Sequence, residues 1–295
     1  MKEALLYGDL TIDRNFSDGR LIYEGIGGPP LFMSKMFRIL GIQPNIYTNY
    51  GTLFPLDELE GAQLYPSQNN EATLLFENSY TGNVRKQTVR MGEKWEVLDL
   101  DKLSEEFRNR QDILIVSPLV PNYSLSDFEN IPVLFPNSLA VLAPQGLFRR
   151  ITKDGIVQKG EWDNADEMIS LFDIIILSEE DGSNLETKGL EWSRKGSKVV
   201  ITQAERGCSI FKDGDTVHFP AFEVPKKDVV DSTGAGDIFA ATFTYAYNLS
   251  ADLSKSAIFA NAAASLSLRL LPNNLEYTME DIYKLINTKY KEFIL

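Results

Sequence analysis

Residues 231–237 bring together residue types that suit phosphate chemistry. The segment is Asp231-Ser232-Thr233-Gly234-Ala235-Gly236-Asp237, and a long apolar stretch follows it. Because glycine carries no side chain, Gly234 and Gly236 let backbone amides approach a ligand closely. The apolar stretch predicts a helix whose N-terminal amides and dipole would point at the same place. The sequence therefore predicts an anion-binding site formed by Gly234, Ala235 and Gly236.

Asp237 stands where this predicted helix begins, and two roles suit it. Aspartate is a common N-terminal cap, worth about 1 kcal/mol. The residues that follow are apolar on nearly every side of the helix, which predicts that the helix is buried. A carboxylate beside an anion site on a buried helix is placed to take a proton from an attacking hydroxyl. We favour this second role and predict that Asp237 is a general base.

The composition of the 295-residue chain excludes several kinds of site. It has one cysteine, Cys208, and one histidine, His218, too few for a structural zinc site or an intrachain disulfide. The net charge is −13 and no dense Lys/Arg cluster occurs, so nucleic-acid binding is not expected. No apolar stretch approaches the roughly 20 residues needed to cross a bilayer, and the apolar run at the N-terminus is too short for a signal peptide. We expect a cytoplasmic protein that does not bind membranes.

The elements that must position this segment alternate along the chain. Continuous apolar runs, typical of strands covered on both faces, occur at 4–7, 44–47, 113–116, 139–142, 174–177, 199–202 and 209–211. Helical periodicity appears between them, for example over 31–40, where Met33, Met36, Phe37 and Leu40 form a stripe. A last helix is predicted to begin near Thr278, with Ile282, Leu285, Ile286, Tyr290 and Phe293 along one face. This alternation predicts a doubly wound α/β sheet in a single domain over 1–295.

Two segments break this rhythm. Residues 13–23 and 72–89 alternate polar and apolar side chains, contain turn formers, and have no helix between their strands. They predict a small antiparallel β-sheet beside the main domain, in the position of a lid.

The 231–237 segment resembles the C-terminal signature of the ribokinase-like (PfkB) family of carbohydrate kinases. Five further segments resemble the family in the same order: Gly8 with Asp13, Gly27-Gly28, residues 178–181, residues 202–207 and residues 260–264. The resemblance implies a doubly wound αβα sandwich with a β lid, ATP as donor and Mg as metal. It also implies that Asp237 is the base and that Gly234, Ala235 and Gly236 form the anion hole. Dimerisation through the lid occurs in this family.

The resemblance assigns further residues by position. For the acceptor they are Asp13, Gly27, Gly28 and Asp231. For the nucleotide they are Thr202, Ala204, Gly207 and Asn261, and for the metal Asp181 and Glu180.

The chain departs from the family pattern at several of these positions. Phe32 occupies the place of an asparagine that bonds a sugar hydroxyl, and an apolar ring cannot form that bond. Ala204 replaces a usual glycine, and Ser178 and Asp181 replace Asn and Glu. Phe32 therefore argues against the usual pose of ribose or fructose, and the other changes are milder.

Residues 143–150 resemble a pattern in the branch of the family that includes plant and archaeal myo-inositol kinases. Gln145 and Arg149 are suited to bond several hydroxyls of a cyclic polyol, although Arg149 could instead cover the surface. A polyol is therefore the leading acceptor, with ribose, a keto-sugar or a nucleoside as alternatives. A non-catalytic ligand-binding protein on a kinase fold is the alternative from another class.

Overall fold

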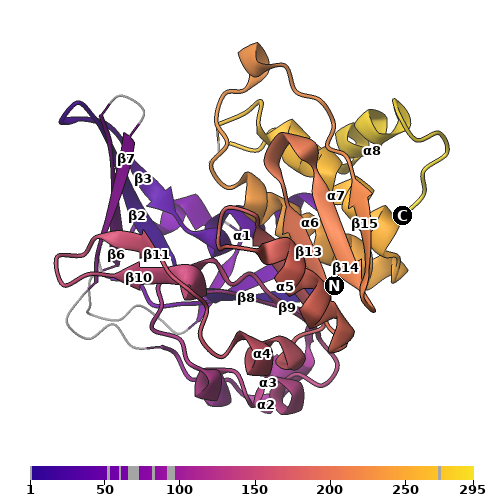
Figure 1. Ribbon diagram of the computed structural model, residues 1–295, viewed down its shortest axis with the longest axis horizontal. Coiled ribbons are helices and arrows are strands. Elements are labelled where there is room, and N and C mark those ends of the chain that lie inside the picture. The colour runs from indigo at the N-terminus through magenta and orange to yellow at the C-terminus, as the bar shows by residue number, and fades with distance from the viewer. Residues whose placement is uncertain are drawn as a thin grey trace.

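The computed structural model describes residues 2–51, 54–59, 61–65, 73–81, 84–91, 97–271 and 274–295, with the side chains of 84 and 85 excepted. A nine-stranded sheet forms its centre, in the order β15-β14-β13-β12-β9-β8-β1-β4-β5 (Figure 1). Its strands are β1 (Glu3–Gly8), β4 (Gln43–Tyr47), β5 (Gln63–Tyr65), β8 (Gln111–Ser117), β9 (Leu139–Leu142), β12 (Ile174–Ser178), β13 (Lys198–Thr202), β14 (Cys208–Lys212) and β15 (Asp215–Phe219). The seven strands β13, β12, β9, β8, β1, β4 and β5 pair in parallel, and β14 and β15 add antiparallel strands at one edge.

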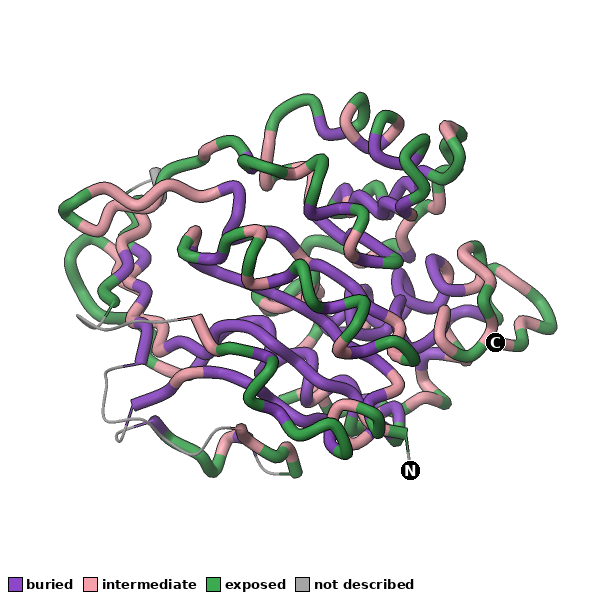
Figure 2. Tube along the Cα trace, turned by 90° about the horizontal axis from the view of Figure 1, so that it is seen from below, coloured by how far each residue is buried: buried purple, intermediate pink, exposed green. Residues whose placement is uncertain are grey.

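The seven predicted apolar runs are confirmed as strands of this sheet. They are continuous because both faces are covered, which Figure 2 shows as buried segments crossing the middle of the molecule. Alternate residues of one strand enter opposite layers: Leu6 belongs to one core cluster and Leu5 to the other.

Helices form the two outer layers. On the face of Leu6 lie α1 (Pro29–Ile39), α6 (Ala235–Ser250), α7 (Leu253–Ser267) and α8 (Met279–Asn287). On the face of Leu5 lie α2 (Glu105–Asn109), α3 (Ile131–Leu134), α4 (Ala165–Met168) and α5 (Leu185–Arg194) (Figure 1). Single 3₁₀ turns are η1 (Leu56–Leu59), η2 (Leu100–Lys102), η3 (Leu125–Asp127), η4 (Gln145–Phe148), η5 (Ile169–Leu171), η6 (Ala204–Arg206) and η7 (Lys226–Asp228). The layered α/β architecture predicted from the sequence is confirmed.

The last helix is shorter than predicted. Thr278 caps it, accepting a hydrogen bond from Asp281 N at 3.3 Å, but the helix ends at Asn287. Tyr290 and Phe293 therefore lie beyond it, although both still pack against the core. The spacing of these two residues fits a helix, but they reach the same core from an irregular segment that follows it. Among the described residues, no helix is long and apolar enough to cross a membrane.

A second sheet stands to one side, at the left of Figure 1. It has the order β3-β2-β6-β7, with β2 (Thr11–Ser17), β3 (Arg20–Gly27), β6 (Leu74–Thr81) and β7 (Val84–Arg90). Both predicted hairpins are antiparallel, and they join through the parallel pair β2–β6. Residues 72, 82 and 83 of the predicted lid lie outside the described residues.

A short hairpin that the sequence did not reveal joins this sheet to the core. It consists of β10 (Arg149–Ile151) and β11 (Val157–Lys159). Its turn bonds the edge strand β7, because Val89 N donates to Gly155 O at 2.8 Å and Thr88 forms a bridge with Ile156. The hairpin begins at Arg149, one of the predicted acceptor residues.

Candidate active site

The start of α6 has the geometry of an anion site. Gly234 is its N-cap with φ of 77°, a backbone conformation that favours glycine. Asp231 Oδ1 accepts a hydrogen bond from Thr233 N at 2.8 Å, and this bond shapes the loop that precedes α6. Ile238 N donates to Gly234 O at 2.9 Å, so the amides of Gly236 and Asp237 precede the first helical bond and point out of the helix. Of the anion hole predicted at Gly234, Ala235 and Gly236, the Ala235 amide instead donates to Ser232 O at 3.3 Å.

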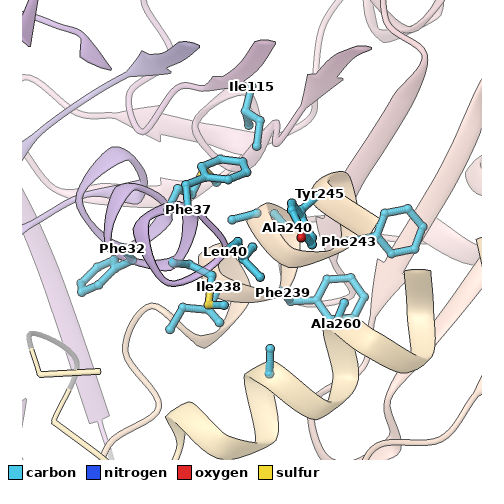
Figure 3. Close-up of a cluster of buried hydrophobic side chains, with 14 of the residues drawn as sticks. Phe32, Phe37, Leu40, Ile115, Ile238, Phe239, Ala240, Phe243, Tyr245 and Ala260 are labelled. Atoms are coloured by element: carbon cyan, nitrogen blue, oxygen red, sulfur yellow. The ribbon is translucent and has the colours of Figure 1, made fainter. Parts of the chain in front are cut away.

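The space in front of these amides is open. A Cβ atom placed on Gly236 would meet no atom within 4 Å. Behind them the helix is anchored firmly, since its side chains from Ile238 to Ala246 are buried. Figure 3 shows Ile238, Phe239 and Phe243 among the apolar side chains of α1 and α7. A rigid helix with open amides at its N-terminus is able to hold a phosphoryl group.

Asp237 does not cap this helix. Gly234 is the N-cap, no side-chain cap is formed, and Asp237 lies in the first turn. The pKa of Asp237 is raised to about 7, chiefly by burial and also by the charge of Asp181, while the charge of Arg149 lowers it. A carboxyl with a pKa near neutrality is suited to accept a proton.

Asp181 follows β12 and faces the same space. Its Oδ2 accepts a hydrogen bond from Ser178 N at 2.8 Å. Burial raises the pKa of Asp181, whereas that backbone bond, the nearby charge of Arg149 and a hydrogen bond from the Gln145 side chain lower it. Gln145, Arg149, Asp181 and Asp237, which come from three separate parts of the sequence, thus lie close together.

The predicted acceptor residues of the N-terminal part also meet. Thr11 Oγ1 donates to Asp13 Oδ1 at 2.9 Å. A Cβ on Gly27 would collide with the Asp13 carboxylate, and one on Gly28 with the backbone oxygen of Asp9. Gly28 also has φ of 97°, so its position requires glycine, whereas a side chain at Gly27 would displace the Asp13 carboxylate.

The predicted nucleotide residues surround the turn after β13. Ala204 has φ of 49° and Gly207 has φ of 101°, and a Cβ on Gly207 would collide with Phe219 O. The turn thus keeps a left-handed residue where the family has glycine, at a cost of roughly 1 kcal/mol. Thr202 Oγ1 donates to Leu177 O at 3.4 Å. Asn261 is buried, and its Nδ2 donates to Phe219 O at 3.2 Å, which ties α7 to the end of β15.

The chemistry around Asp181 fits a divalent cation. Mg²⁺ takes oxygen ligands, commonly one or two carboxylates together with waters and substrate phosphates. The carboxyls of Asp181 and Asp237 are close enough to repel each other, and a cation would relieve that repulsion. Glu180 is exposed, and its amide donates to Ser178 Oγ at 3.2 Å. Across the part of the chain that the structure describes, no three acidic, His or Cys side chains surround one metal position.

Sequence reasoning missed Asp9, which is 1% exposed at the end of β1. Its carboxylate accepts hydrogen bonds from Leu119 N at 2.7 Å and from Tyr123 OH at 3.1 Å. The sequence offers a weak signal, a carboxylate directly after a buried strand. Its partners, about 110 positions away, have no local signature.

Comparisons with known proteins agree with this geometry. Residues 151–270 match the family described as pfkB family carbohydrate kinase. A cytidine kinase of Thermococcus kodakarensis is 24% identical over 267 residues, which cover 84% of this chain and 89% of that protein. A ribokinase structure from Thermotoga maritima superposes with a TM-score of 0.73 at 16% identity, covering 97% of this chain and 99% of that one.

A further solved structure is of a pyrophosphate-dependent kinase in the ribokinase family, complexed with a pyrophosphate analog and myo-inositol. It superposes with a TM-score of 0.73 at 17% identity, covering 96% of this chain and 99% of the other. The sheet order, the 231–237 segment and the match over residues 151–270 lead to one assignment: the chain has the ribokinase-like fold, and its residues 151–270 are similar to pfkB family carbohydrate kinases.

Proposed function

We propose that this protein is an ATP-dependent kinase that phosphorylates a hydroxyl of a sugar or cyclic polyol, with Asp237 as general base. One observation carries the proposal: a carboxyl with a pKa near 7 adjoins the open N-terminal amides of α6. A pure binding protein has no need of a base at that point. The non-catalytic alternative therefore has less support.

The reaction follows from the positions of these groups. Asp237 accepts the proton of the acceptor hydroxyl as its oxygen attacks the γ-phosphorus; the new P–O bond forms as the bond to the ADP oxygen breaks. The amides of Gly236 and Asp237 stabilise the charge on the transferred phosphoryl group. Mg²⁺, held by Asp181 with Glu180 nearby, would supply positive charge to the phosphates.

The acceptor class rests on η4 and the hairpin that follows it. The Gln145 side chain and the Arg149 guanidinium lie beside Asp181 and Asp237, so they present donors to several hydroxyls of one ring. Phe32 offers no hydrogen bond where a sugar hydroxyl is usually held. We therefore favour a cyclic polyol such as myo-inositol. A nucleoside remains the alternative that the cytidine kinase relative favours.

The four-stranded sheet is proposed to act as a lid and as a dimer surface. Its strand β3 lies at the sheet edge and exposes Leu21, Ile22 and Tyr23. Apolar side chains on an exposed edge strand favour pairing with a second copy. Sedimentation of wild type and Ile22→Lys tests this: we expect a dimer that the substitution dissociates, and a monomeric wild type would contradict it.

The decisive experiment measures ADP release from MgATP across myo-inositol, ribose, fructose, adenosine and cytidine, and in parallel phosphate release with pyrophosphate as a second donor. We expect turnover with one acceptor and a loss of at least ~100-fold in Asp237→Asn. Asp252→Asn is the matched control, since Asp252 caps α7 outside the site and asparagine also caps helices. Turnover unaffected by Asp237→Asn would remove the proposed base; acceptor binding without turnover would favour the non-catalytic alternative.

A further inference from the structure

Asp9 is a buried carboxylate to which the proposed mechanism assigns no role. It directly follows β1 and accepts one hydrogen bond at each oxygen: Leu119 N donates to Oδ2 at 2.7 Å and Tyr123 OH to Oδ1 at 3.1 Å. Both donors belong to the loop after β8. Burying a charged group costs free energy unless the group is paired, so a buried aspartate points to a specific structural or functional role.

The loop that Asp9 holds also holds Arg149. Leu119 N donates to Asp9, and the carbonyl of the same residue accepts a hydrogen bond from Arg149 Nη1 at 2.9 Å. The turn before Arg149 rests on this loop as well. Gly146 N donates to Pro118 O at 2.9 Å, and a Cβ on Gly146 would lie 2.6 Å from the Leu119 carbonyl carbon.

Arg149 in turn touches the lid. Its guanidinium carbon lies 5.6 Å from the centre of the Phe76 ring on β6, within the range of a cation–π contact. Phe76 packs in a small apolar cluster with Leu119 and Val120 of the same loop. A continuous series of contacts thus runs from Asp9 through the 118–120 loop to Arg149 and Phe76.

Electrostatic interactions also link Asp9, through Arg149, to the proposed site of transfer. The positive charge of Arg149 acts on Asp9, and it also acts on Asp181 and Asp237 at the proposed site of transfer. The Asp9 carboxylate, held in place by hydrogen bonds from Leu119 and Tyr123, thus interacts with the same cation that acts on the reacting groups. A cation in such a setting keeps one orientation better than a free surface arginine does.

We propose that Asp9 is a positioning residue that fixes Arg149 between the acceptor site and the lid. It acts through the 118–120 loop and through its charge, without touching the substrate. An asparagine cannot replace it, because its amide carries one acceptor oxygen and must turn its NH₂ toward one of the two donors. The effect on the acceptor rests on the proposed kinase function, whereas the link to the lid does not.

Hydrogen exchange of the substrate-free protein tests the link to the lid. In Asp9→Asn we expect faster exchange in β6, residues 74–81, and unchanged exchange in β13, residues 198–202. Tyr123→Phe is the matched control: it removes one hydrogen bond and keeps the carboxylate, so we expect a smaller change in β6. Equal exchange in β6 of wild type, Asp9→Asn and Arg149→Lys would overturn the proposal even if no acceptor had been found.

Kinetics test the link to the acceptor. We expect Asp9→Asn to raise the acceptor KM by about tenfold, the scale of one lost hydrogen bond to a charged group, with little change in the KM for ATP. In an Arg149→Lys background the same substitution should change the acceptor KM by less than twofold, because both changes break one connection. Fully additive effects, or equal rises in both KM values, would overturn the positioning role. If Asp9→Asn fails to fold, Tyr123→Phe and its double variant with Arg149→Lys decide by the same criteria.

Discussion

The ring of Phe32 lies against the backbone of Gly234. A Cβ atom on Gly234 would come within 2.6 Å of Phe32 Cγ. Phe32 belongs to α1, which follows the paired glycines of the acceptor side, whereas Gly234 is the N-cap of α6. Figure 3 shows Phe32 on α1, beside the start of α6 and Ile238. Phe32, which departs from the family pattern, therefore packs against the anion-binding turn.

This contact predicts that alanine substitutions at Gly234 and Gly236 differ in their effect on stability. Gly234→Ala places a methyl group against Phe32 in a left-handed conformation, so we expect a stability loss of at least ~1 kcal/mol together with lost activity. Gly236→Ala has open space around its Cβ, so its stability should stay within about 1 kcal/mol of wild type. Its methyl group would nevertheless enter the anion site and raise the KM for ATP. Thermal unfolding with steady-state kinetics compares them, and equal stability of the two variants would contradict this packing.

Phe32 also offers a test of acceptor preference. Phe32→Asn restores the polar group that the family uses, so we expect turnover of ribose or fructose relative to myo-inositol to rise by about tenfold. Phe32→Leu is the control, because it shortens the side chain and remains apolar. Both variants should lose stability, at most ~3–5 kcal/mol, since each leaves space beside Gly234. A rise of equal size in Phe32→Leu would show that space, and not hydrogen bonding, sets the preference.

The pKa of Asp237 predicts a pH profile. A general base must be deprotonated, and burial raises the pKa of Asp237 to about 7. Acceptor kcat/KM should therefore fall about tenfold per pH unit below pH 7 and level off above it. Arg149 lowers this pKa, so Arg149→Gln should move the acidic limb to higher pH. A limb centred near pH 4 would contradict the raised pKa of Asp237.

Asp9 predicts a pH dependence of stability. Burial raises the pKa of Asp9 to about 6 from an ordinary value of 3.8, despite hydrogen bonds from Leu119, Tyr123 and Val120 that lower it. A folded-state pKa above the unfolded value favours folding at low pH, and this contribution is lost as pH rises through 6. The stability of wild type relative to Asp9→Asn should therefore fall by about 3 kcal/mol at most between pH 4 and pH 7. Urea unfolding at several pH values measures this, and a constant difference would argue against the raised pKa.

The sequence alone determined the local elements and the reactive segment. Continuous apolar runs predicted the strands of the main sheet, because a strand buried on both faces leaves that record in consecutive residues. The glycines and carboxylates of residues 231–237 predicted the start of α6, and the prolines before Leu31 lie in the first turn of α1, where proline fits. Each of these features depends on residues that are close together in the chain.

The tertiary structure decided which distant residues meet. It placed Asp9 against Leu119 and Arg149 against Phe76, and it joined the two lid hairpins through a parallel strand pair. It also showed that Gly234, and not Asp237, caps α6. Such contacts arise from packing between segments far apart in sequence, so they leave no periodicity at either end. Local pattern thus identified the chemical groups, whereas long-range packing determined the protonation of Asp237 and the residues that surround it.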